Sequence, residues 1–538
     1  MSTSAKIKRL DQRPMKDAIM SKNKFRFLGL TLDDFIKYFF QGNALIAIVV
    51  LALITISLFS SGIWFIPQNY QNLVIYRQAG LEYVDYLRQE IDDHTALTRY
   101  LSNLRLQQMQ LLLKEGKTPE EAQAALTPLD TFITAYSDAA TPLNDMLSEQ
   151  TDIAAAIKDK HNSQQEELHG KEMLLKAGKT EEAAALQVEP VDFKTAVHPL
   201  LDMRDTYIET NGIFAETLSN LVFHPPKMVS RSLQPKMDRF RDLSRTYLIE
   251  LPKYEDQIMN WDQFKPIPKY KALTSFLFGR QWLTASFWQD WYGIIPLLVG
   301  SLTVSFVALV IAIPFGVGAA IYINQIASPT EQNLIKPYIE FISAIPSVVL
   351  GFFGIAVLGQ SMRWLSQQEW LAWVPGFPIN ERLNIFTAGA LLALMAVPTI
   401  FTLTEDAINN VPRAFKEASY ALGATRLQTI LKIMIPASLS GIISAVLLGL
   451  GRVVGETMVV LLCAGGRIEI PDFMQGLGAF FQPVHTMTGI IAQEMGEVVQ
   501  GSIHFHALFM VGIILFLLSL VINYLAQQVV HKYKISIG

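Results

Sequence analysis

The sequence predicts an all-α polytopic membrane protein with about six membrane-spanning helices and a large helical extracytoplasmic insertion. Hydrophobic residues make up 51% of the 538 residues and charged residues only 17%, whereas soluble proteins carry roughly 25% charged residues. Mean hydropathy is +0.28, and several apolar runs reach the length of about 20 residues that a helix needs to cross a bilayer. The net charge of −4 offers no basic surface for nucleic acid.

Six apolar runs are candidates for membrane-spanning helices. The third run contains Pro346, and a proline inside a span frees a backbone carbonyl that neighbouring groups must satisfy. We therefore interpret Pro346 as a kink within that span. In the same run, the i, i+4 spacing of Lys336 and Glu340 predicts a helical ion pair near its cytoplasmic end. The predicted spans are 43–66, 292–323, 334–358, 385–403, 438–463 and 507–529.

The distribution of charge predicts the topology. Residues 1–42 form a basic segment with nine Lys and Arg residues, which the positive-inside rule places in the cytoplasm. Six crossings return the tail, residues 531–538, to the same side. The first span is too long and starts too late to be a cleavable signal peptide. We expect a multi-pass protein of the inner (plasma) membrane, with both termini cytoplasmic.

This topology places residues 67–290 outside the cytoplasm as a mostly helical domain. The stretch 81–113 is rich in Leu, Gln, Arg and Glu. Gly116 is suited to end one helix and Thr118 to cap the next. From residue 224 to 290 the chain becomes rich in proline and aromatic residues, which predicts a strap returning to the membrane.

We expect no catalytic residue, no metal site and no cofactor. A P-loop needs a glycine five residues before its Gly-Lys pair, but Leu111 and Met173 occupy those positions before the two Gly-Lys-Thr triplets. The single cysteine, Cys463, excludes a multi-cysteine metal site. Three histidines between the last two spans lack supporting ligands. They are His485, His504 and His506.

The most specific functional motif lies between the fourth and fifth spans, in residues 413–436. It consists of Glu417-Ala418-Ser419, three residues, Gly423, nine residues and then Ile433-Met434-Ile435-Pro436. This pattern resembles the EAA loop of ABC-importer permeases, with Ser419 and Ile435 as mild departures. We expect a short helix, a turn that glycine permits, and a second helix along the membrane face.

The resemblance implies that this loop docks on a partner ATPase subunit and transmits its closure. The residues implied in this ATPase coupling are Glu417, Ala418, Gly423 and Arg426. Small side chains let the loop enter a groove of the partner, and Lys416 and Arg426 offer charged contacts. The alternative interpretation is an ordinary amphipathic connector.

The fifth span contains Gly449-Leu450-Gly451-Arg452-Val453-Val454-Gly455-Glu456-Thr457. A charge at membrane depth is costly, on the order of 2.5–3.5 kcal/mol on insertion scales. The i, i+4 spacing predicts that Arg452 and Glu456 share one helical face, where Ala445 and Gly449 leave room for a neighbour. A guanidinium fork suits an oxyanion, with Glu456 orienting Arg452. A buried ion pair that only locks two helices is an equal alternative from spacing alone.

A wider resemblance covers residues 292–530. Segments such as Pro296-Leu297-Leu298-Val299-Gly300-Ser301-Leu302 and Ile345-Pro346-Ser347-Val348-Val349-Leu350-Gly351, together with the Gly-Glu-Thr-Met ending at 455–458, resemble the C-type membrane subunit of Pst phosphate ABC importers. This implies an ABC importer permease fold for residues 291–530. The insertion at 67–290 departs from the family pattern and inherits nothing from it.

The resemblance implies a permease that imports inorganic phosphate, with Arg452, Glu456, Thr457 and Ser347 along the substrate path. For Ser347, a simple packing role beside Pro346 is the competing interpretation. The implied partners are a related A-type permease, two ATP-binding cassette ATPases that hydrolyse ATP, and an extracytoplasmic phosphate-binding protein. The chain itself is not expected to be an enzyme. The alternatives are a permease for sulfate or molybdate and a membrane-anchored sensor that uses the outer domain.

Overall fold

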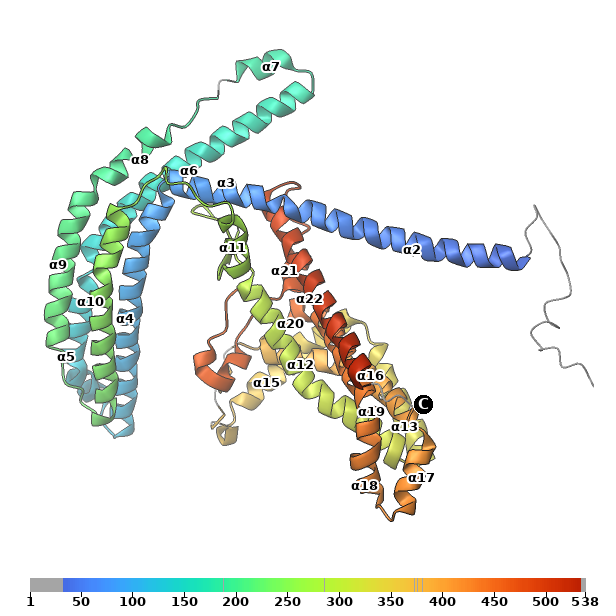
Figure 1. Ribbon diagram of the computed structural model, residues 1–538. Coiled ribbons are helices and arrows are strands. Elements are labelled where there is room, and N and C mark those ends of the chain that lie inside the picture. The colour runs from blue at the N-terminus through green and yellow to red at the C-terminus, as the bar shows by residue number, and fades with distance from the viewer. Residues whose placement is uncertain are drawn as a thin grey trace, which may run out of the picture.

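The computed structural model describes residues 32–533, except residues 187, 285, 372, 375 and 380. The chain forms a helical bundle beside a group of membrane helices, joined by a narrow neck (Figure 1). Most of the predicted basic N-terminal segment, and Lys534 in the tail, lie outside the described residues. Six helical stretches in the described part are long and apolar enough to cross a membrane, which confirms the predicted number. They are 36–78, 295–326, 347–366, 385–409, 426–454 and 503–529.

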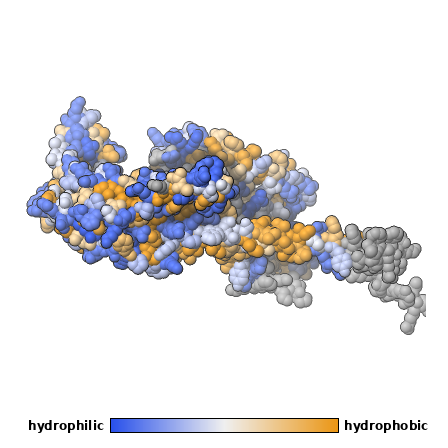
Figure 2. All heavy atoms as spheres, turned by 90° about the horizontal axis from the view of Figure 1, so that it is seen from above, coloured by the Kyte–Doolittle hydropathy of each residue, from blue (hydrophilic) through white to orange (hydrophobic). Residues whose placement is uncertain are grey.

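The first span, α2 (Leu32–Ile63), continues after a one-residue break into α3 (Phe65–Gln78). Only the last turns of α2 contact the other membrane helices, where Gly62 lies against Ile513 of α22 (Ile503–Tyr533). In Figure 2, the hydrophobic colour covers this helix, whereas the bundle is mostly hydrophilic. The side chains of α2 are exposed along most of its length, as expected for a helix surrounded by lipid.

The centre of the membrane region is formed by α12 (Ile295–Ile321), α16 (Ile385–Asn409) and α19 (Ile435–Val454). Gly389 of α16 lies against Val307 of α12, and Gly449 of α19 lies against Ile400 of α16. A Cβ at either glycine would lie within 3.0 Å of its neighbour. Small residues at these points therefore allow the backbones to approach closely, and the predicted close neighbour of Gly449 is α16.

The third predicted span, 334–358, is wrong in its boundaries and in the role of Pro346. The chain forms α13 (Pro329–Ser343) and then, after a break, α14 (Ser347–Phe353). Pro346 occupies the N-cap of α14 with extended backbone angles. Proline lacks an N–H and disfavours a helical residue before it, so it separates two helices here instead of kinking one. The span continues as a π-turn (Gly354–Leu358) and α15 (Gly359–Ser366).

The fifth predicted span, 438–463, is not one continuous helix. It begins earlier, with α18 (Arg426–Thr429) and a π-turn (Ile430–Met434), and α19 ends at Val454. Residues 455–457 are non-helical, and α20 (Met458–Cys463) follows. Glycine is a poor helix former, and the Glu456 carboxylate accepts a hydrogen bond from the backbone N–H of Met458 at 3.2 Å, which starts a new helix.

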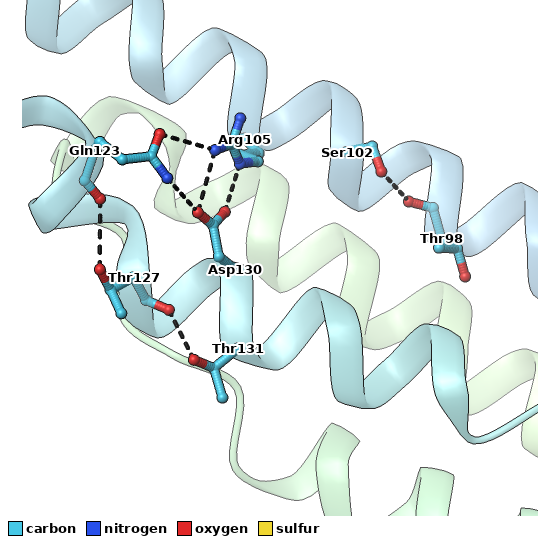
Figure 3. Close-up of polar contacts among 7 residues, drawn as sticks. All are labelled: Thr98, Ser102, Arg105, Gln123, Thr127, Asp130 and Thr131. Atoms are coloured by element: carbon cyan, nitrogen blue, oxygen red, sulfur yellow. Dashed lines mark hydrogen bonds and ion pairs between the residues drawn. The ribbon is translucent and has the colours of Figure 1, made fainter. Parts of the chain in front are cut away.

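The outer bundle has its own apolar core, which 35 buried residues from Ala79 to Trp288 form. The predicted turn is confirmed: Gly116 has φ +88°, and Thr118 caps α5 through its side chain. Between α4 and α5, Arg105 forms an ion pair with Asp130, and Gln123 hydrogen-bonds both (Figure 3). The bundle helices are α4 (Leu81–Lys114), α5 (Pro119–Asp138), α6 (Thr141–Lys176), α7 (Thr180–Ala185), α8 (Phe193–Asp202), α9 (Arg204–Phe223) and α10 (Gln234–Met259).

The predicted strap at 224–290 is only partly correct, because α10 occupies its first half and packs in the bundle. Pro235 lies in the first turn of α10, where its missing N–H has no intrahelical partner to lose. The return to the membrane runs through residues 260–294. It contains α11 (Lys271–Phe278) and the two short antiparallel strands β1 (Trp282–Leu283) and β2 (Trp291–Tyr292).

Few contacts join the bundle to the membrane helices. Asn69 of α3 donates to the Ala272 carbonyl at 2.8 Å, and Asn72 donates to the Asp290 carbonyl at 3.0 Å. Lys158 of α6 donates to the carbonyl of Trp288. These bonds join the returning chain to α3, the extension of the first span, and to α6 of the bundle.

Candidate functional site

The segment 413–436 has the predicted helix–turn–helix form. α17 (Arg413–Ala421) ends before Gly423, which has φ +80°, a conformation that only glycine adopts without strain. Thr425 then caps α18 in a capping box with Gln428. The hydroxyl groups of Ser419 and Thr429 lie 2.9 Å apart and tie the two helices together.

The outer face of this helix–turn–helix is open to solvent. Glu417, Ala418 and Gly423 are exposed, and Leu422 is 89% exposed. A cavity of about 470 Å³ lies between α17 and the helix that follows, lined by Phe415, Ala418, Ser419, Leu422, Gly423, Ala424, Gln428, Lys432 and Ile433. Phe415 and Leu422 are both exposed and both line this cavity, and exposed apolar side chains that form one patch are typical of a protein contact surface.

The two cations predicted to contact a partner are engaged within the chain. The Arg426 guanidinium donates to the Gln325 carbonyl from Nε at 2.9 Å and from Nη2 at 2.5 Å. The Lys416 ammonium donates to Gln325 Oε1 at 3.1 Å. Gln325 lies in the π-turn Tyr322–Ile326 that ends the second span, where backbone carbonyls have no helical partner. Arg426 therefore links the coupling segment to the second span.

This link continues to the fourth span. Gln325 Nε2 donates to Asn324 Oδ1 at 2.5 Å, and Asn324 Nδ2 donates to Asn409 Oδ1 at 2.6 Å, at the end of α16. Lys336 of α13 forms an ion pair with Glu405 of α16, and not with the neighbouring Glu340 that sequence spacing suggests. The ends of the second and fourth spans, α13 and the coupling segment are thus joined by polar contacts.

Arg452 lies near the middle of the membrane helices. Its Nη1 donates to Thr399 Oγ1 of α16 at 2.9 Å. The two helices run antiparallel, because Gly441 meets Ala407 and Gly449 meets Ile400. Thr399 is well inside the 25-residue α16, about 20 Å from its start at 1.5 Å per residue. The guanidinium therefore lies well inside the length of α16, although Arg452 itself is two residues before the end of α19 at Val454.

The predicted pairing of Arg452 with Glu456 is wrong. Among the described residues the two side chains form no ion pair. The i, i+4 argument requires one continuous helix, but the helix ends between them at Gly455. Arg452 stays on α19, while the Glu456 side chain turns to the start of α20 and its carbonyl accepts from Thr488 Oγ1 at 2.8 Å.

The four substrate-path residues lie at two helix breaks. Ser347 is the first residue of α14, after the break at Pro346, and Thr457 is the N-cap of α20. The helices after the breaks pack together: a Cβ on Gly351 would meet Leu462, and the Cys463 thiol contacts the Gly351 carbonyl at 3.3 Å. No side-chain hydrogen bond within the described residues links Ser347 or Thr457 to Arg452.

Three residues that the sequence did not single out complete these contacts: Thr399, Gln325 and Glu405. Each comes from a different span than its partner, so no spacing in the sequence signals the pair. Within the described residues, no cluster of three or more His, Cys, Asp or Glu side chains could hold a metal ion. Instead, His504 pairs with Glu494 at 2.7 Å and His506 hydrogen-bonds the Ser61 carbonyl.

Comparisons with known proteins agree with this architecture. Residues 312–535 match the family described as binding-protein-dependent transport system inner membrane component. A probable ABC transporter permease protein, YqgH of Bacillus subtilis (strain 168), is 33% identical over 272 residues, which cover 48% of this chain and 82% of YqgH. The phosphate transport system permease protein PstC of Pasteurella multocida (strain Pm70) is 30% identical over 283 residues, covering 51% and 83%.

Among solved structures, the inward-facing MetNI methionine ABC transporter matches 45% of this chain and 94% of its own, with 19% identity and a TM-score of 0.32. The curated relatives are permease subunits and not enzymes, as the sequence predicts for this protein. The chain therefore belongs to the binding-protein-dependent transport system inner membrane component family, as a multi-pass permease of the Pst type.

Proposed function

We propose that this chain imports inorganic phosphate across the inner membrane as one permease of an ABC importer. A second, A-type permease completes the pathway, and two ATPase subunits supply the energy of ATP hydrolysis. An extracytoplasmic binding protein delivers the anion. Relatives that are about 30% identical and named phosphate transport system permeases support this substrate.

The single observation that carries the proposal is the environment of Arg452. Its guanidinium lies beside the interior of α16, and its only hydrogen-bond partner among the described residues is the neutral Thr399 hydroxyl. Charges at this depth are normally paired and mark ion pathways. Without a carboxylate partner, the charge of the guanidinium is not compensated, and its remaining N–H groups can bind an anion. Had Glu456 formed a buried ion pair with Arg452, which is the alternative that spacing leaves open, the same arginine could serve only to lock two helices together.

The helix breaks suit an anion path. Non-helical backbone within a membrane is tolerated where it lines a cavity or lies within protein, and transporters place substrate sites at such breaks. Ser347 and Thr457 supply hydroxyl groups at the two breaks. The Glu456 carboxylate accepts from the Met458 N–H at the start of α20. With Ser301, Ser305, Thr486 and Thr488, Glu456 also lines a narrow void. We assign Glu456 to holding the second break in shape.

The coupling segment would dock on an ATPase through the exposed surface of Glu417, Ala418 and Gly423. Movement there would reach the second span through Arg426 and Gln325. This arrangement supports the predicted topology, because the coupling segment, the end of the second span and the end of the fourth span must all be cytoplasmic. The first and last chain ends would then be cytoplasmic, and residues 67–290 would lie outside.

Uptake of labelled phosphate at micromolar concentration tests this function, in cells that lack their own importer. The wild-type chain is compared with Arg452→Ala and with Thr399→Val, which removes the hydrogen bond and keeps the charge. Membrane levels are measured for each, and labelled sulfate is run in parallel. We expect Arg452→Ala to lose phosphate uptake and Thr399→Val to retain most of it.

Normal uptake by Arg452→Ala would overturn the role of Arg452 in the pathway. Sulfate uptake without phosphate uptake by the wild-type chain would replace the substrate with another oxyanion. Failure of an ATPase to co-purify with the wild-type chain would contradict the ABC-importer assembly itself.

A further inference from the structure

The neck contains an unusual distribution of charge. Residues 263–289, which we call the neck segment, include Lys265, Lys269, Lys271 and Arg280 but no Asp or Glu. All four cations are exposed, and none forms an ion pair with a described residue. In a chain with a net charge of −4, this segment forms a local positive surface.

Exposed aromatic side chains alternate with these cations. Phe264, Tyr270, Phe278 and Phe287 are exposed, with Phe278 at 71% and Phe287 at 77%. Aromatic rings left open in water carry a free-energy cost, but they are favoured at the interface between lipid headgroups and water. Cations and aromatic rings together characterise segments that lie in this interface.

The neck segment also packs against three of the candidate membrane helices. Phe276 packs on Phe65, at the start of α3, with ring centroids 5.2 Å apart. Trp282 packs on Tyr292, three residues before α12 begins, at 5.5 Å. Both belong to one buried cluster with Met510 and Val511 of the last span. The position therefore follows from contacts with three membrane helices.

A pocket of about 420 Å³ lies between α3 and α11 in this region. Lys271, Thr274 and Ser275 form a polar part of its wall, and the rest is largely apolar. The other lining residues are Leu73, Tyr76, Arg77, Glu82, Ile267, Phe278, Gly279 and Trp291. Arg77 is already neutralised by Glu82, at 2.5 and 2.8 Å. Lys271 forms no ion pair with a described residue, although its charge also acts on the nearby Glu82 carboxylate that Arg77 binds.

We propose that the neck segment binds an anionic phospholipid. The phosphodiester headgroup contacts Lys271 and the neighbouring cations, and the first carbons of the lipid tails lie against Leu73 and Phe278. A bound lipid thereby fixes the angle at which the outer bundle leaves the membrane. This proposal is independent of the transported substrate, because it concerns a different surface of the chain.

The test measures binding of fluorescent phosphatidylglycerol to the full-length chain in a neutral detergent. A quadruple variant carries Lys265→Gln, Lys269→Gln, Lys271→Gln and Arg280→Gln. A matched control replaces four exposed cations of the bundle, Lys114→Gln, Lys227→Gln, Arg231→Gln and Arg239→Gln. We expect the neck variant to bind at least about tenfold more weakly and the control to bind like the wild type. Phosphatidylcholine should not distinguish the three proteins.

Equal affinity of wild type and neck variant would overturn the proposal, as would an equal loss in the control, which would indicate nonspecific charge attraction. Displacement of the lipid by millimolar inorganic phosphate would assign the surface to the free anion. The single charge reversal Lys271→Glu provides a second test at the pocket. Thermal unfolding without anionic lipid checks that each variant is folded, and Lys271→Glu should also lose at least about tenfold in affinity.

Discussion

A buried carboxylate and a buried histidine in the outer bundle make opposite contributions to its pH stability. Glu90 and His94 are one turn apart on α4 and are 0% and 2% exposed. Burial raises the pKa of Glu90 from its ordinary value of 4.5 to about 7, against a smaller opposite effect of the hydrogen bond from Tyr207. Burial lowers the pKa of His94 from 6.5 to about 4.

The two signs follow from linkage. Glu90 binds its proton more tightly in the folded bundle, so its stabilising contribution is complete below pH 4.5 and is lost as pH rises through 7. His94 binds its proton less tightly when folded, so its contribution is complete above pH 6.5 and is lost as pH falls through 4. At about 1.4 kcal/mol per pH unit, each effect amounts to roughly 3 kcal/mol. In the wild type they nearly cancel between pH 4.5 and 6.5.

The substitution Glu90→Gln removes one side of this balance. Gln stays neutral and accepts from Tyr207 as Glu90 does at 2.7 Å. Its NH2 group replaces Glu90 Oε1, which, like Asn211 Oδ1, has no hydrogen-bond partner among the described residues. We expect the variant to be more stable than wild type by roughly 3 kcal/mol above pH 7. Near pH 4.5 it should differ little. Its stability should fall on acidification, because only His94 then titrates.

Amide hydrogen exchange of peptides from α4 and α9 in the full-length chain measures this local stability, after correction for the pH dependence of intrinsic exchange. Glu216→Gln, an exposed carboxylate on α9, is the control and should match the wild type at every pH. Exchange at pH 8 that is as fast in Glu90→Gln as in the wild type would contradict the cost of ionising Glu90 in the folded bundle. A pH profile with the same slope as that of the wild type would contradict it as well.

Three further predictions concern the cytoplasmic contacts. Gly423→Ala should strain the coupling turn by about 1–2 kcal/mol, because glycine is required there by the positive φ and not by neighbouring atoms. Measured together, ATP hydrolysis should then continue without a matching rate of transport. Unchanged coupling between the two rates would contradict the docking role. Gln325→Ala removes the side-chain acceptor of Lys416 but keeps the backbone carbonyl that binds Arg426. ATP-coupled transport in vesicles should therefore weaken less in Gln325→Ala than in Arg426→Ala. A larger loss in Gln325→Ala would contradict the connection of the coupling segment to the second span through Arg426. Lys336→Met should leave Glu405 without its ion-pair partner and destabilise the folded chain by on the order of 1–3 kcal/mol, as measured by thermal unfolding. Adding Glu405→Leu should restore the stability. A double variant that is no more stable than Lys336→Met would contradict the pairing.

Much of the membrane architecture is readable from local pattern. A run of about 20 apolar residues can satisfy its backbone only as a helix within lipid, so the number of spans follows from the sequence. Gly116, Thr118 and the turn at Gly423 are equally local, since capping and positive φ depend on a few adjacent residues. The family resemblance also rests on contiguous motifs, and it covers the part of the chain that the comparisons match.

The errors arise where neighbours in space decide the outcome. Pro346 and Gly455 interrupt helices that hydropathy alone reads as continuous, because hydropathy does not report the hydrogen-bond partners at a break. The outer bundle gives another example. The proline content of residues 224–290 predicts a strap, but the apolar face of α10 packs in the bundle and makes this part helical.

By itself, the sequence determined that six apolar helices form a permease with a polar helical insertion. It also placed a coupling motif between the fourth and fifth helices. Only the tertiary structure decided the partners of the charged residues. Spacing along one helix pairs Arg452 with Glu456 and Lys336 with Glu340. The packed helices instead bring Thr399 to Arg452 and Glu405 to Lys336. An ion pair depends on distance in space, and residues far apart in the chain set that distance once the helices pack.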